Sequence, residues 1–232
     1  MGDNPKLGDF LKSYTLRTYK KGDVIIFQAE APRYAYVIDS GIIKAYNLTI
    51  NGDEKPVAFY KAGDFFPGAW VFSEIASATF FYEAFTATVN VYCVERDDFI
   101  KYLKSDSDLM FKYLVHQSSD ELSQSMHINA LQQSRASDKL LYILHFLALS
   151  TGATPSGQEL ELKINLTHQD LANLTGLTRE TAAVELNKLK KQGLVSYGPG
   201  KPYCLHLDKL NALANDRYLQ ELTLPSQQAE RR

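Results

Sequence analysis

The hydrophobic positions of this chain follow different periods in its two halves. Over residues 15–95, short runs rich in Val, Ile, Phe and Tyr alternate with polar positions and end at glycine turns, among them Gly22, Gly41, Gly52 and Gly63. Alternation on this scale, broken by tight turns, indicates an antiparallel β-sandwich or barrel. The sequence therefore predicts an N-terminal β domain.

Helical spacing replaces this alternation after residue 96. A helical region is predicted to begin at Asp97, and a single long helix is predicted from about Asp106 to Gln133. Its best stripe is close to a heptad repeat but turns polar in its second half, which limits the apolar area that it can bury. The stripe consists of Phe111, Leu114, Ser118, Leu122, Ser125, Asn129 and Gln133.

The segment after the long helix predicts a second domain. Residues 134–138 interrupt the helical spacing and offer a new N-cap, so we place a hinge there. Residues 139–149 predict a strongly apolar helix, on which we expect His145 to be a packed side chain and not a ligand. Residues 151–158 are rich in Gly, Pro and Ser and predict a loop, and residues 159–166 alternate as a strand.

Residues 166–195 carry the signals of a helix-turn-helix. Thr167, followed three residues later by Asp170, predicts a capping box at the start of one helix. Gly176 suits the left-handed conformation of the turn, and Thr178 is placed to cap a second helix. The spacing of these signals predicts two short helices joined by a tight turn.

The second helix has one packing side and one outward side. Ala182, Leu186 and Leu189 share a side and are predicted to pack. Arg179 and Glu180 on the outward side suit the major groove of DNA, because Arg can donate to guanine O6 and N7 and Glu can accept from cytosine N4. A pair of surface helices with ordinary solvated charges is the alternative. The remaining outward residues are Ala183, Val184 and Asn187.

The residues after this helix favour DNA binding over that alternative. Lys188, Lys190 and Lys191 lie at its end, and residues 194–197 and 203–207 predict two short strands. A turn-rich tip that carries Lys201 joins the two strands. This arrangement is typical of a winged helix.

At this point the chain resembles the CRP/FNR family of bacterial transcription regulators. The recognition helix of that family typically opens with Ser or Thr followed by Arg-Glu-Thr, and residues 178–181 read Thr-Arg-Glu-Thr. The glycine turns of the β domain also look like those of the cyclic-nucleotide-binding β-roll of this family. The resemblance covers nearly the whole chain. It implies an α+β fold with an antiparallel, jelly-roll-like β-roll, a long dimerisation helix and a C-terminal winged helix-turn-helix.

The resemblance also implies domain boundaries. Residues 1–105 would form the sensor domain, residues 106–134 the dimerisation helix and hinge, and residues 135–224 the DNA-binding domain. Asp208 is predicted to cap a final helix through Leu219. The polar tail, residues 225–232, is predicted to be disordered.

By the family's pattern, Arg179, Glu180, Ala183 and Val184 would read bases. Val184 departs from the family's best-known member, which has a second base-reading Arg there, so an apolar side chain is expected to favour a thymine methyl group. The residues expected near phosphates are Thr167, His168, Thr178, Thr181, Lys188 and Lys201.

In the family the long helix pairs with its twin, which implies a homodimer that binds a pseudo-palindromic site in double-stranded DNA. We prefer this interpretation because a single half-site of a few base pairs gives a lone chain little specificity. The alternative is that the helix only packs on the β-roll. RNA polymerase is a further partner that the resemblance suggests. The expected dimer positions are Leu114, Ser118, Leu122, Ser125 and Asn129.

The pocket of the β-roll departs from the nucleotide-binding members of the family. Those members supply a Gly-Glu pair and an Arg-Ser pair, because a buried phosphate needs a cation and hydrogen-bond donors. Residues 65–70 read Phe-Phe-Pro-Gly-Ala-Trp and the Arg-Ser site falls at about Thr79 and Phe80, so both signatures are missing. The nearest charge, Glu83, repels anions. Cyclic AMP or GMP binding in the usual mode is therefore not expected.

The same stretch is unusually aromatic, and two interpretations remain open. The rings line a pocket for an apolar or aromatic small molecule, or they fill the pocket as ordinary core. The residues are Phe65, Phe66, Trp70, Phe72, Phe80, Phe81, Tyr82 and Phe85.

The residue inventory argues against other sensing chemistries, and we expect no cofactor and no metal. The two cysteines, Cys93 and Cys204, are too few for the iron–sulfur cluster of some family members. No histidine precedes His116, so the β domain lacks an obvious metal or haem ligand and a base for catalysis. Cys93 lies in a predicted strand, where a buried, unreactive thiol is expected. We therefore predict that the protein is not an enzyme.

Size and charge agree with a two-domain DNA-binding protein. The chain has 232 residues, 45% of them hydrophobic, which suffices for two modest cores. Residues 1–134 carry 13 Lys and Arg and 17 Asp and Glu, a net charge of −4, and residues 135–232 carry 12 and 10, a net charge of +2. The positive side coincides with the predicted DNA-binding half.

No apolar run approaches membrane-spanning length and residues 1–10 lack signal-peptide features, so a soluble cytoplasmic protein is expected. A β-roll module that controls a partner protein by docking, with the winged helix as the docking surface, is the competing function. DNA binding weakens steeply as salt rises, which distinguishes the two.

Overall fold

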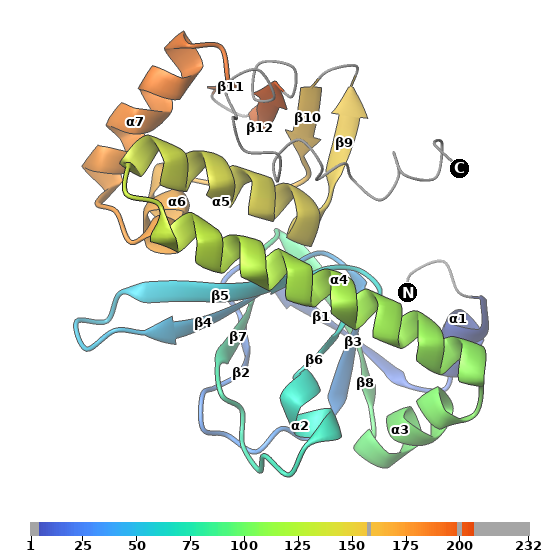
Figure 1. Cartoon of the computed structure of the whole chain (residues 1–232). Coiled ribbons are helices and arrows are strands. Elements are labelled where there is room, and N and C mark those ends of the chain that lie inside the picture. Colours follow the sequence, from blue (N-terminus) through green and yellow to red (C-terminus); the bar gives the residue numbers. More distant parts are fainter. Residues whose placement is uncertain (1–4, 157–158, 199–200, 207–232) are drawn as a thin grey trace. The chain divides into compact units, whose positions relative to one another are not determined.

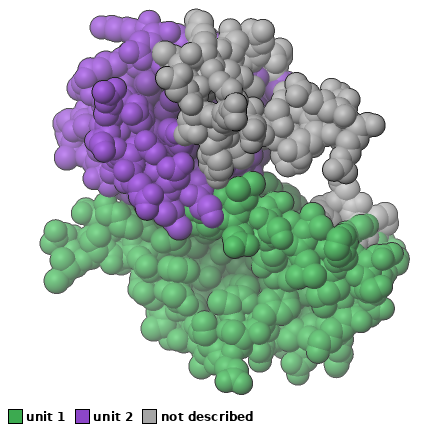
Figure 2. All heavy atoms as spheres, in the orientation of Figure 1, with its two compact units in different colours: residues 1–124 green, residues 125–232 purple. Residues whose placement is uncertain are grey.

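The computed structural model describes residues 5–156, 159–198 and 201–206. The chain divides into two compact units, residues 1–124 and residues 125–232 (Figure 2). Each unit contains antiparallel sheet and helices, which confirms the predicted α+β fold class.

The first unit is built on two four-stranded antiparallel sheets, with strand orders β1-β8-β3-β6 and β2-β7-β4-β5 (Figure 1). These strands occupy the region where the alternating pattern predicts a β domain. Their bounds are β1 (Thr15–Lys20), β2 (Val24–Ile26), β3 (Ala35–Ser40), β4 (Ile43–Leu48), β5 (Glu54–Tyr60), β6 (Phe65–Phe66), β7 (Phe81–Ala84) and β8 (Thr88–Val94).

Strand β3 shows how the first unit divides its apolar residues between two cores. Tyr36 and Ile38 point to the space between the sheets, where they pack with residues of both sheets. Ala35 and Val37 point to the opposite face and pack against helices. Because successive side chains of a strand alternate between faces, a run of buried residues on β3 implies a sheet that is covered on both sides.

Four helices supply the cover on the outer face of that sheet. The core there contains Leu7, Val71, Phe99 and Tyr113, one from each helix. The helices are α1 (Pro5–Leu11), α2 (Gly68–Phe72), α3 (Arg96–Lys104) and the first part of α4 (Ser107–Gln132). The bounds of α3 and α4 confirm the predicted helical region and the predicted long helix to within one residue.

The four predicted turn glycines all adopt positive φ, between 83° and 91°. Gly41 has a second reason to be glycine, since a Cβ atom there would lie 2.5 Å from the carbonyl oxygen of Thr88. The turns between these strands therefore depend on glycine as the sequence indicates.

The second unit packs three helices with a four-stranded sheet of order β11-β12-β10-β9. The apolar helix α5 contacts both α6 and α7, and its buried residues include Leu140, Leu144 and Phe146. The elements are α5 (Ala136–Thr151), β9 (Ala153–Ser156), β10 (Glu159–Leu162), α6 (His168–Thr175), α7 (Arg179–Lys191), β11 (Val195–Gly198) and β12 (Lys201–His206).

The boundary between the units lies inside α4, between Gln124 and Ser125, and not at the predicted hinge, residues 134–138. The last two turns of α4 pack with the second unit. The ring of His127 stacks on Phe146 of α5 with centroids 4.6 Å apart, and its Nε2 lies 3.4 Å from the carbonyl oxygen of Leu174 in α6. Tertiary packing, and not the break in helical spacing, therefore sets the boundary.

Three local predictions in the second unit need correction. The predicted loop, residues 151–158, contains strand β9, whose Pro155 is tolerated because β9 is an edge strand. The predicted strand 159–166 ends at Leu162. Helix α5 begins after Arg135, which makes no side-chain cap hydrogen bond, so residues 134–138 supply no side-chain N-cap. The predicted helix from Asp208 and the tail from Pro225 lie outside the described residues.

Candidate nucleic-acid interface

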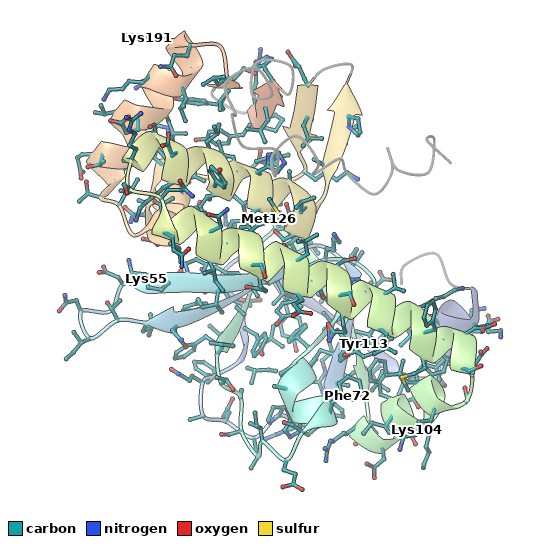
Figure 3. All side chains as sticks on the ribbon, viewed as in Figure 1. Lys55, Phe72, Lys104, Tyr113, Met126 and Lys191 are labelled. Atoms are coloured by element: carbon teal, nitrogen blue, oxygen red, sulfur yellow. The ribbon has the colours of Figure 1, made fainter. Side chains whose placement is uncertain are left out.

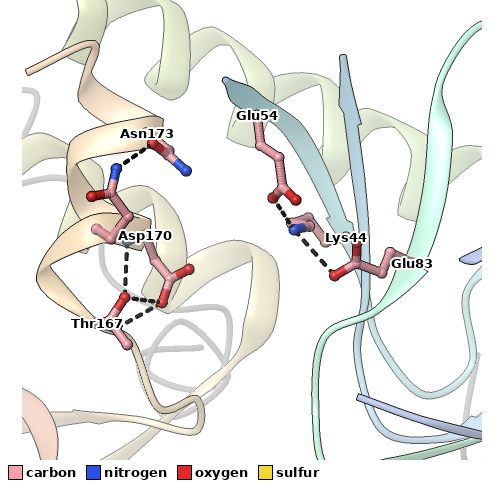
Figure 4. Close-up of polar contacts among 7 residues, drawn as sticks. Lys44, Glu54, Glu83, Thr167, Asp170 and Asn173 are labelled. Atoms are coloured by element: carbon pink, nitrogen blue, oxygen red, sulfur yellow. Dashed lines mark hydrogen bonds and ion pairs between the residues drawn. The ribbon is translucent and has the colours of Figure 1, made fainter. Parts of the chain in front are cut away.

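Helix α6 starts with the predicted capping box (Figure 4). The Thr167 hydroxyl oxygen accepts a hydrogen bond from the Asp170 backbone N–H at 3.1 Å, and the Asp170 carboxylate accepts one from the Thr167 backbone N–H at 2.7 Å. Reciprocal bonds of this kind satisfy two N–H groups that a helix start leaves unpaired. They fix the point at which the chain enters α6.

The turn between α6 and α7 is held by Gly176, which adopts the predicted left-handed conformation with φ 70° and ψ 15°. The Leu177 backbone N–H then donates to the carbonyl oxygen of Ala172 at 3.1 Å. This bond satisfies a carbonyl that the helix end leaves free and fixes the departure of the chain toward α7.

Helix α7 presents the predicted faces. The Thr178 hydroxyl oxygen accepts from the Thr181 backbone N–H at 3.1 Å and caps the helix. The packing side, Ala182, Leu186 and Leu189, is buried. On the outward side Arg179, Glu180, Val184 and Asn187 are exposed, and Ala183 is partly exposed. The first two turns of α7 thus offer a guanidinium, a carboxylate and small apolar groups on one accessible surface.

The last turn of α7 carries three lysines, and two of them have partners within the second unit. The Nζ atom of Lys188 lies 2.6 Å from Glu185 Oε1, and that of Lys190 donates to the carbonyl oxygen of Tyr197 at 2.8 Å. Lys191 is exposed at the end of the helix (Figure 3). Two of the three ammonium groups of this turn therefore already have partners within the protein.

The residues predicted near phosphates lie in four places of the second unit. Thr167 and His168 are at the start of α6, Thr178 and Thr181 at the start of α7, and Lys201 is exposed at the first position of β12. Lys188, the sixth, is on the last turn of α7. The hydroxyl of Thr178 also bonds that of Thr181 at 3.0 Å, so these two side chains act first as a helix cap.

Helix α4 exposes a set of large apolar side chains. Phe111 is 67% exposed, and the predicted dimer positions Leu114, Ser118, Leu122 and Ser125 are exposed, while Asn129 is half-buried. Monomers rarely leave so many apolar side chains of one helix in water. The exposed apolar residues of α4 are Phe111, Leu114, Val115, Leu122, Ile128 and Leu131.

The aromatic residues predicted as a pocket or a core are distributed over three places in the first unit. Phe66 and Tyr82 stack at 5.1 Å in the core between the sheets, and Phe80 packs against this core. Phe65, Trp70 and Phe72 lie on the helix side, where Phe72 is 5.2 Å from Tyr113 (Figure 3). Phe85 is 5.3 Å from Phe59. Phe65, Phe66, Phe72, Tyr82 and Phe85 pack against other rings, and the set is divided between separate places.

Glu83, the nearest charge to this region, has a cation partner that sequence reasoning missed. The Lys44 Nζ lies 3.2 Å from Glu83 Oε1 and also bonds Glu54, so β4 joins its neighbours β7 and β5 by ion pairs (Figure 4). Lys44 is buried, and a buried ammonium is tolerated only when carboxylates compensate its charge. The charge of Lys44 therefore offsets the repulsion of anions that was expected from Glu83.

Both cysteines are free thiols. Burial raises the pKa of Cys93 and that of Cys204, which disfavours the reactive thiolate. His145 is buried on α5. Among the described residues no group of three His, Cys, Asp or Glu side chains is arranged to hold a metal ion. None of the described helices has the length and apolar character of a membrane span.

Tyr197 contacts two residues of the candidate interface, Asn187 and His168, and sequence reasoning missed it. Its hydroxyl donates to Asn187 Oδ1 at 3.0 Å, and its ring lies 4.9 Å from Tyr203 and 5.7 Å from His168. Tyr197 and Asn187 are ten residues apart and lie on a strand and a helix. No periodic pattern in the sequence pairs them, so only the tertiary structure reveals the contact.

Comparisons with known proteins agree with both units. Residues 16–106 match the model of the cyclic nucleotide-binding domain, and residues 139–215 match that of the Crp-like helix-turn-helix domain. The regulator ArcR of Staphylococcus haemolyticus is 28% identical over 183 residues, 76% of each chain. The regulatory protein HlyX of Actinobacillus pleuropneumoniae is 26% identical over 178 residues, 76% of this chain and 72% of its own.

Solved structures share the fold. FixK2 from Bradyrhizobium japonicum superposes with a TM-score of 0.66 at 21% identity, over 90% of this chain and 96% of its own. A CRP/FNR-family transcriptional regulator from Thermus thermophilus gives a TM-score of 0.66 at 24% identity, over 88% of this chain and all of its own.

A β-roll of the cyclic nucleotide-binding type, a long helix and a Crp-like helix-turn-helix define a transcription regulator with a DNA-binding domain. The chain belongs to the CRP/FNR family. Of the two relatives named above, HlyX is a regulatory protein and ArcR is an HTH-type transcriptional regulator.

Proposed function

We propose that this regulator is a homodimer that binds a pseudo-palindromic DNA site, with α7 in the major groove of each half-site. The observation that carries the proposal is the exposed outward side of α7, where Arg179 and Glu180 stand free of ion pairs among the described residues. Arg suits guanine O6 and N7, Glu suits cytosine N4, and the half-buried to exposed Ala183 and Val184 suit a thymine methyl group.

Phosphate contacts from the starts of both helices complete this arrangement. A helix N-terminus attracts anions through its N–H groups and its dipole, and α6 and α7 both begin with Thr caps. Thr167, His168, Thr178 and Thr181 would lie along the phosphates, with Lys188 and Lys201 at the edges.

The second copy of the chain is proposed to cover the exposed side of α4. Phe111, Leu114, Val115 and Leu122 recur at helical spacing and are all exposed in the single chain, which supports a paired helix. A dimer also doubles the number of base pairs that are read, and this raises the specificity above the low value that one short half-site can give. We assign residues 106–134 to this role, with the boundary between the two units inside this segment.

We propose further that this regulator binds DNA without a small-molecule effector. The rings of Phe66 and Tyr82 stack on each other in a buried core, and Glu83 is neutralised by Lys44, so the β-roll fills its interior with its own side chains. RNA polymerase is the proposed further partner, as for other transcription regulators of this class, and the cytoplasm, where bacterial DNA lies, is the proposed location.

Selection from random duplex DNA by the purified, ligand-free protein tests this function, with binding to the selected sequence followed across salt concentrations. We expect a palindrome, and an affinity that falls steeply as salt rises because phosphate contacts release counterions. Enrichment only after addition of a small-molecule extract would show that the protein needs an effector. No enrichment in either condition would favour a module that docks on a partner protein.

Sedimentation of variants tests the dimer separately. Leu114→Asp and Leu122→Asp place a charge on the exposed stripe and are expected to shift the protein to monomer. Lys112→Asp puts the same side chain at an exposed position beside the stripe and should leave the dimer intact. If all three variants sedimented alike, the assignment of the exposed side of α4 as the dimer surface would be wrong.

A further inference from the structure

Tyr197 in strand β11 gathers side chains from three other elements of the second unit. Its hydroxyl donates to Asn187 of α7 at 3.0 Å, and the Lys190 ammonium of the same helix lies 4.7 Å from the centre of its ring. The ring of Tyr203 in β12 stacks on that of Tyr197 at 4.9 Å, and His168 of α6 makes a T-shaped contact with it at 5.7 Å. A single side chain thus links the wing to both helices of the helix-turn-helix.

The pairing of the two wing strands is irregular at Tyr197. The pairing of β11 with β12 changes register between Ser196 and Gly198, at the position of Tyr197. Pro202 lies in the same irregularity and has no N–H to donate to the ladder. The carbonyl oxygen of Tyr197 instead accepts the Lys190 ammonium at 2.8 Å. Irregular pairing of this kind commonly redirects a side chain near a functional surface.

Asn187 is the contact of Tyr197 that faces the solvent on the outward side of α7. It is exposed and follows Ala183 and Val184 by one helical turn, so it continues the surface that carries Arg179. A free Asn side chain offers both a carbonyl oxygen and an amide, the pair that recognises adenine N6 and N7. In this structure Oδ1 of Asn187 accepts the phenolic hydrogen bond with one of its two lone pairs, which orients the amide group and leaves its N–H groups as donors for another partner.

We propose that Tyr197 is a positioning residue that holds Asn187 as a hydrogen-bond donor to an acceptor atom on DNA. This rests on the proposed entry of α7 into the major groove. The acceptor is an atom of a base edge, such as guanine O6 or N7 or thymine O4, or it is a phosphate oxygen. A held donor disfavours adenine at the facing position, because a bidentate contact with adenine needs Oδ1 turned toward the adenine amino group, whereas the bond to Tyr197 holds Oδ1 toward the wing.

The ring contacts of Tyr197 hold its hydroxyl in place. Stacking on Tyr203 and the cation above its face restrict rotation of the ring, and its desolvation raises the pKa of the phenol, which therefore stays a hydrogen-bond donor. Tyr197→Phe removes the hydroxyl and leaves every ring contact in place, so it isolates the bond to Asn187. Tyr203→Phe is the matched control, since it removes a phenol from the same stack that makes no hydrogen bond to Asn187.

The test is selection from random duplex DNA by the full chain and by Tyr197→Phe, Tyr203→Phe, Asn187→Ala and the double variant Tyr197→Phe with Asn187→Ala. If the acceptor is a base, Tyr197→Phe relaxes discrimination against adenine at one position of each half-site by roughly five- to tenfold, and other positions keep their preference. If it is a phosphate, affinity falls by a similar factor on every sequence. In either case Tyr203→Phe behaves as the unchanged protein.

The double variant decides whether Tyr197 acts through Asn187. We expect Tyr197→Phe to have no further effect once Asn187 is Ala, because the bond that it removes no longer exists. Equal effects of Tyr197→Phe in both backgrounds, or no effect in either, would overturn the proposal while leaving DNA binding by α7 intact. Failure of the unchanged protein to select any sequence would overturn the proposed function, and this proposal with it.

Discussion

His116 of α4 and Asp64, which lies just before β6, form an ion pair in which Nε2 and Oδ1 are 2.8 Å apart. The second oxygen of Asp64 accepts a hydrogen bond from the backbone N–H of Lys61 at 2.8 Å, which holds the carboxylate toward the helix. Asp120, one turn further along α4, has an oxygen 3.6 Å from the same Nε2. The long helix is thus attached to the β-roll through a histidine between two carboxylates.

This pair predicts a pH dependence of stability. The hydrogen bond to Asp64 raises the pKa of His116 above its ordinary value of 6.5, with further contributions from the charges of Asp64 and Asp120. Burial also raises the pKa of Asp120. Because the folded protein binds these protons more tightly than the unfolded chain, their stabilisation is complete below the unfolded pKa and is lost as pH rises through the folded one.

We expect the free energy of unfolding to fall by about 1 kcal/mol more in the unchanged protein than in His116→Gln between about pH 6 and pH 8. Denaturant unfolding at several pH values measures this difference. The carboxylates of Asp64 and Asp120 face the imidazole, so Asp64→Asn is the control and should remove most of the same pH dependence. Parallel pH profiles for His116→Gln and the unchanged protein would contradict the prediction.

Substitutions of Phe66 and Phe72 should differ in their effect on the free energy of unfolding of the first unit. Phe66 is fully buried between Tyr36 and Tyr82, with centroid distances of 5.3 Å and 5.1 Å, whereas Phe72 is 44% exposed. Phe66→Ala is expected to lower the free energy of unfolding by about 3–5 kcal/mol, and Phe72→Ala by about 1 kcal/mol. If Phe66→Ala cost as little as Phe72→Ala, its ring would line an open pocket instead of a packed core.

Arg179 predicts sequence-dependent affinity. Arg179→Ala is expected to weaken binding to the selected site by about 1–3 kcal/mol and to relax the preference at one base pair. Lys191→Ala, on the exposed last turn of the same helix, is the control and should weaken binding to all sequences and reduce the salt dependence by about one charge. A uniform loss with Arg179→Ala would identify its guanidinium as a phosphate contact.

Val184 predicts a preference for thymine at its position. The side chain is 54% exposed, so its methyl groups are available to a thymine methyl in the major groove. Val184→Ala removes two methyl groups and is expected to reduce that preference by about 1 kcal/mol, with other positions unchanged. Position-specific selection measures this, and an unaltered profile would show that Val184 does not touch the bases.

Features that depend on neighbouring residues were predictable from the sequence. The capping box of Thr167 and Asp170, the left-handed Gly176 and the buried side of α7 all follow from spacings of a few residues, and the structure confirms them. The β domain and the long helix likewise follow from periods of two and of about 3.6 residues.

Features set by tertiary contacts were not predictable. The unit boundary inside α4 depends on His127 packing with Phe146, and nothing in the spacing of α4 indicates it. The partner of Glu83, Lys44, lies on a neighbouring strand nearly forty residues away in sequence. The bond between Tyr197 and Asn187 requires an irregular wing, whose register the sequence does not specify.

The engagement of Lys188 by Glu185, and of Lys190 by Tyr197, affects how this regulator would search a genome. A lysine that keeps its own partner neutralises fewer phosphates and so releases fewer counterions from DNA, and we therefore expect a low affinity for arbitrary sequences. Dwell times on wrong sites are then short, and fewer molecules are sequestered by the excess of bulk DNA. Occupancy of the correct site would depend on the base contacts of α7 more than on charge.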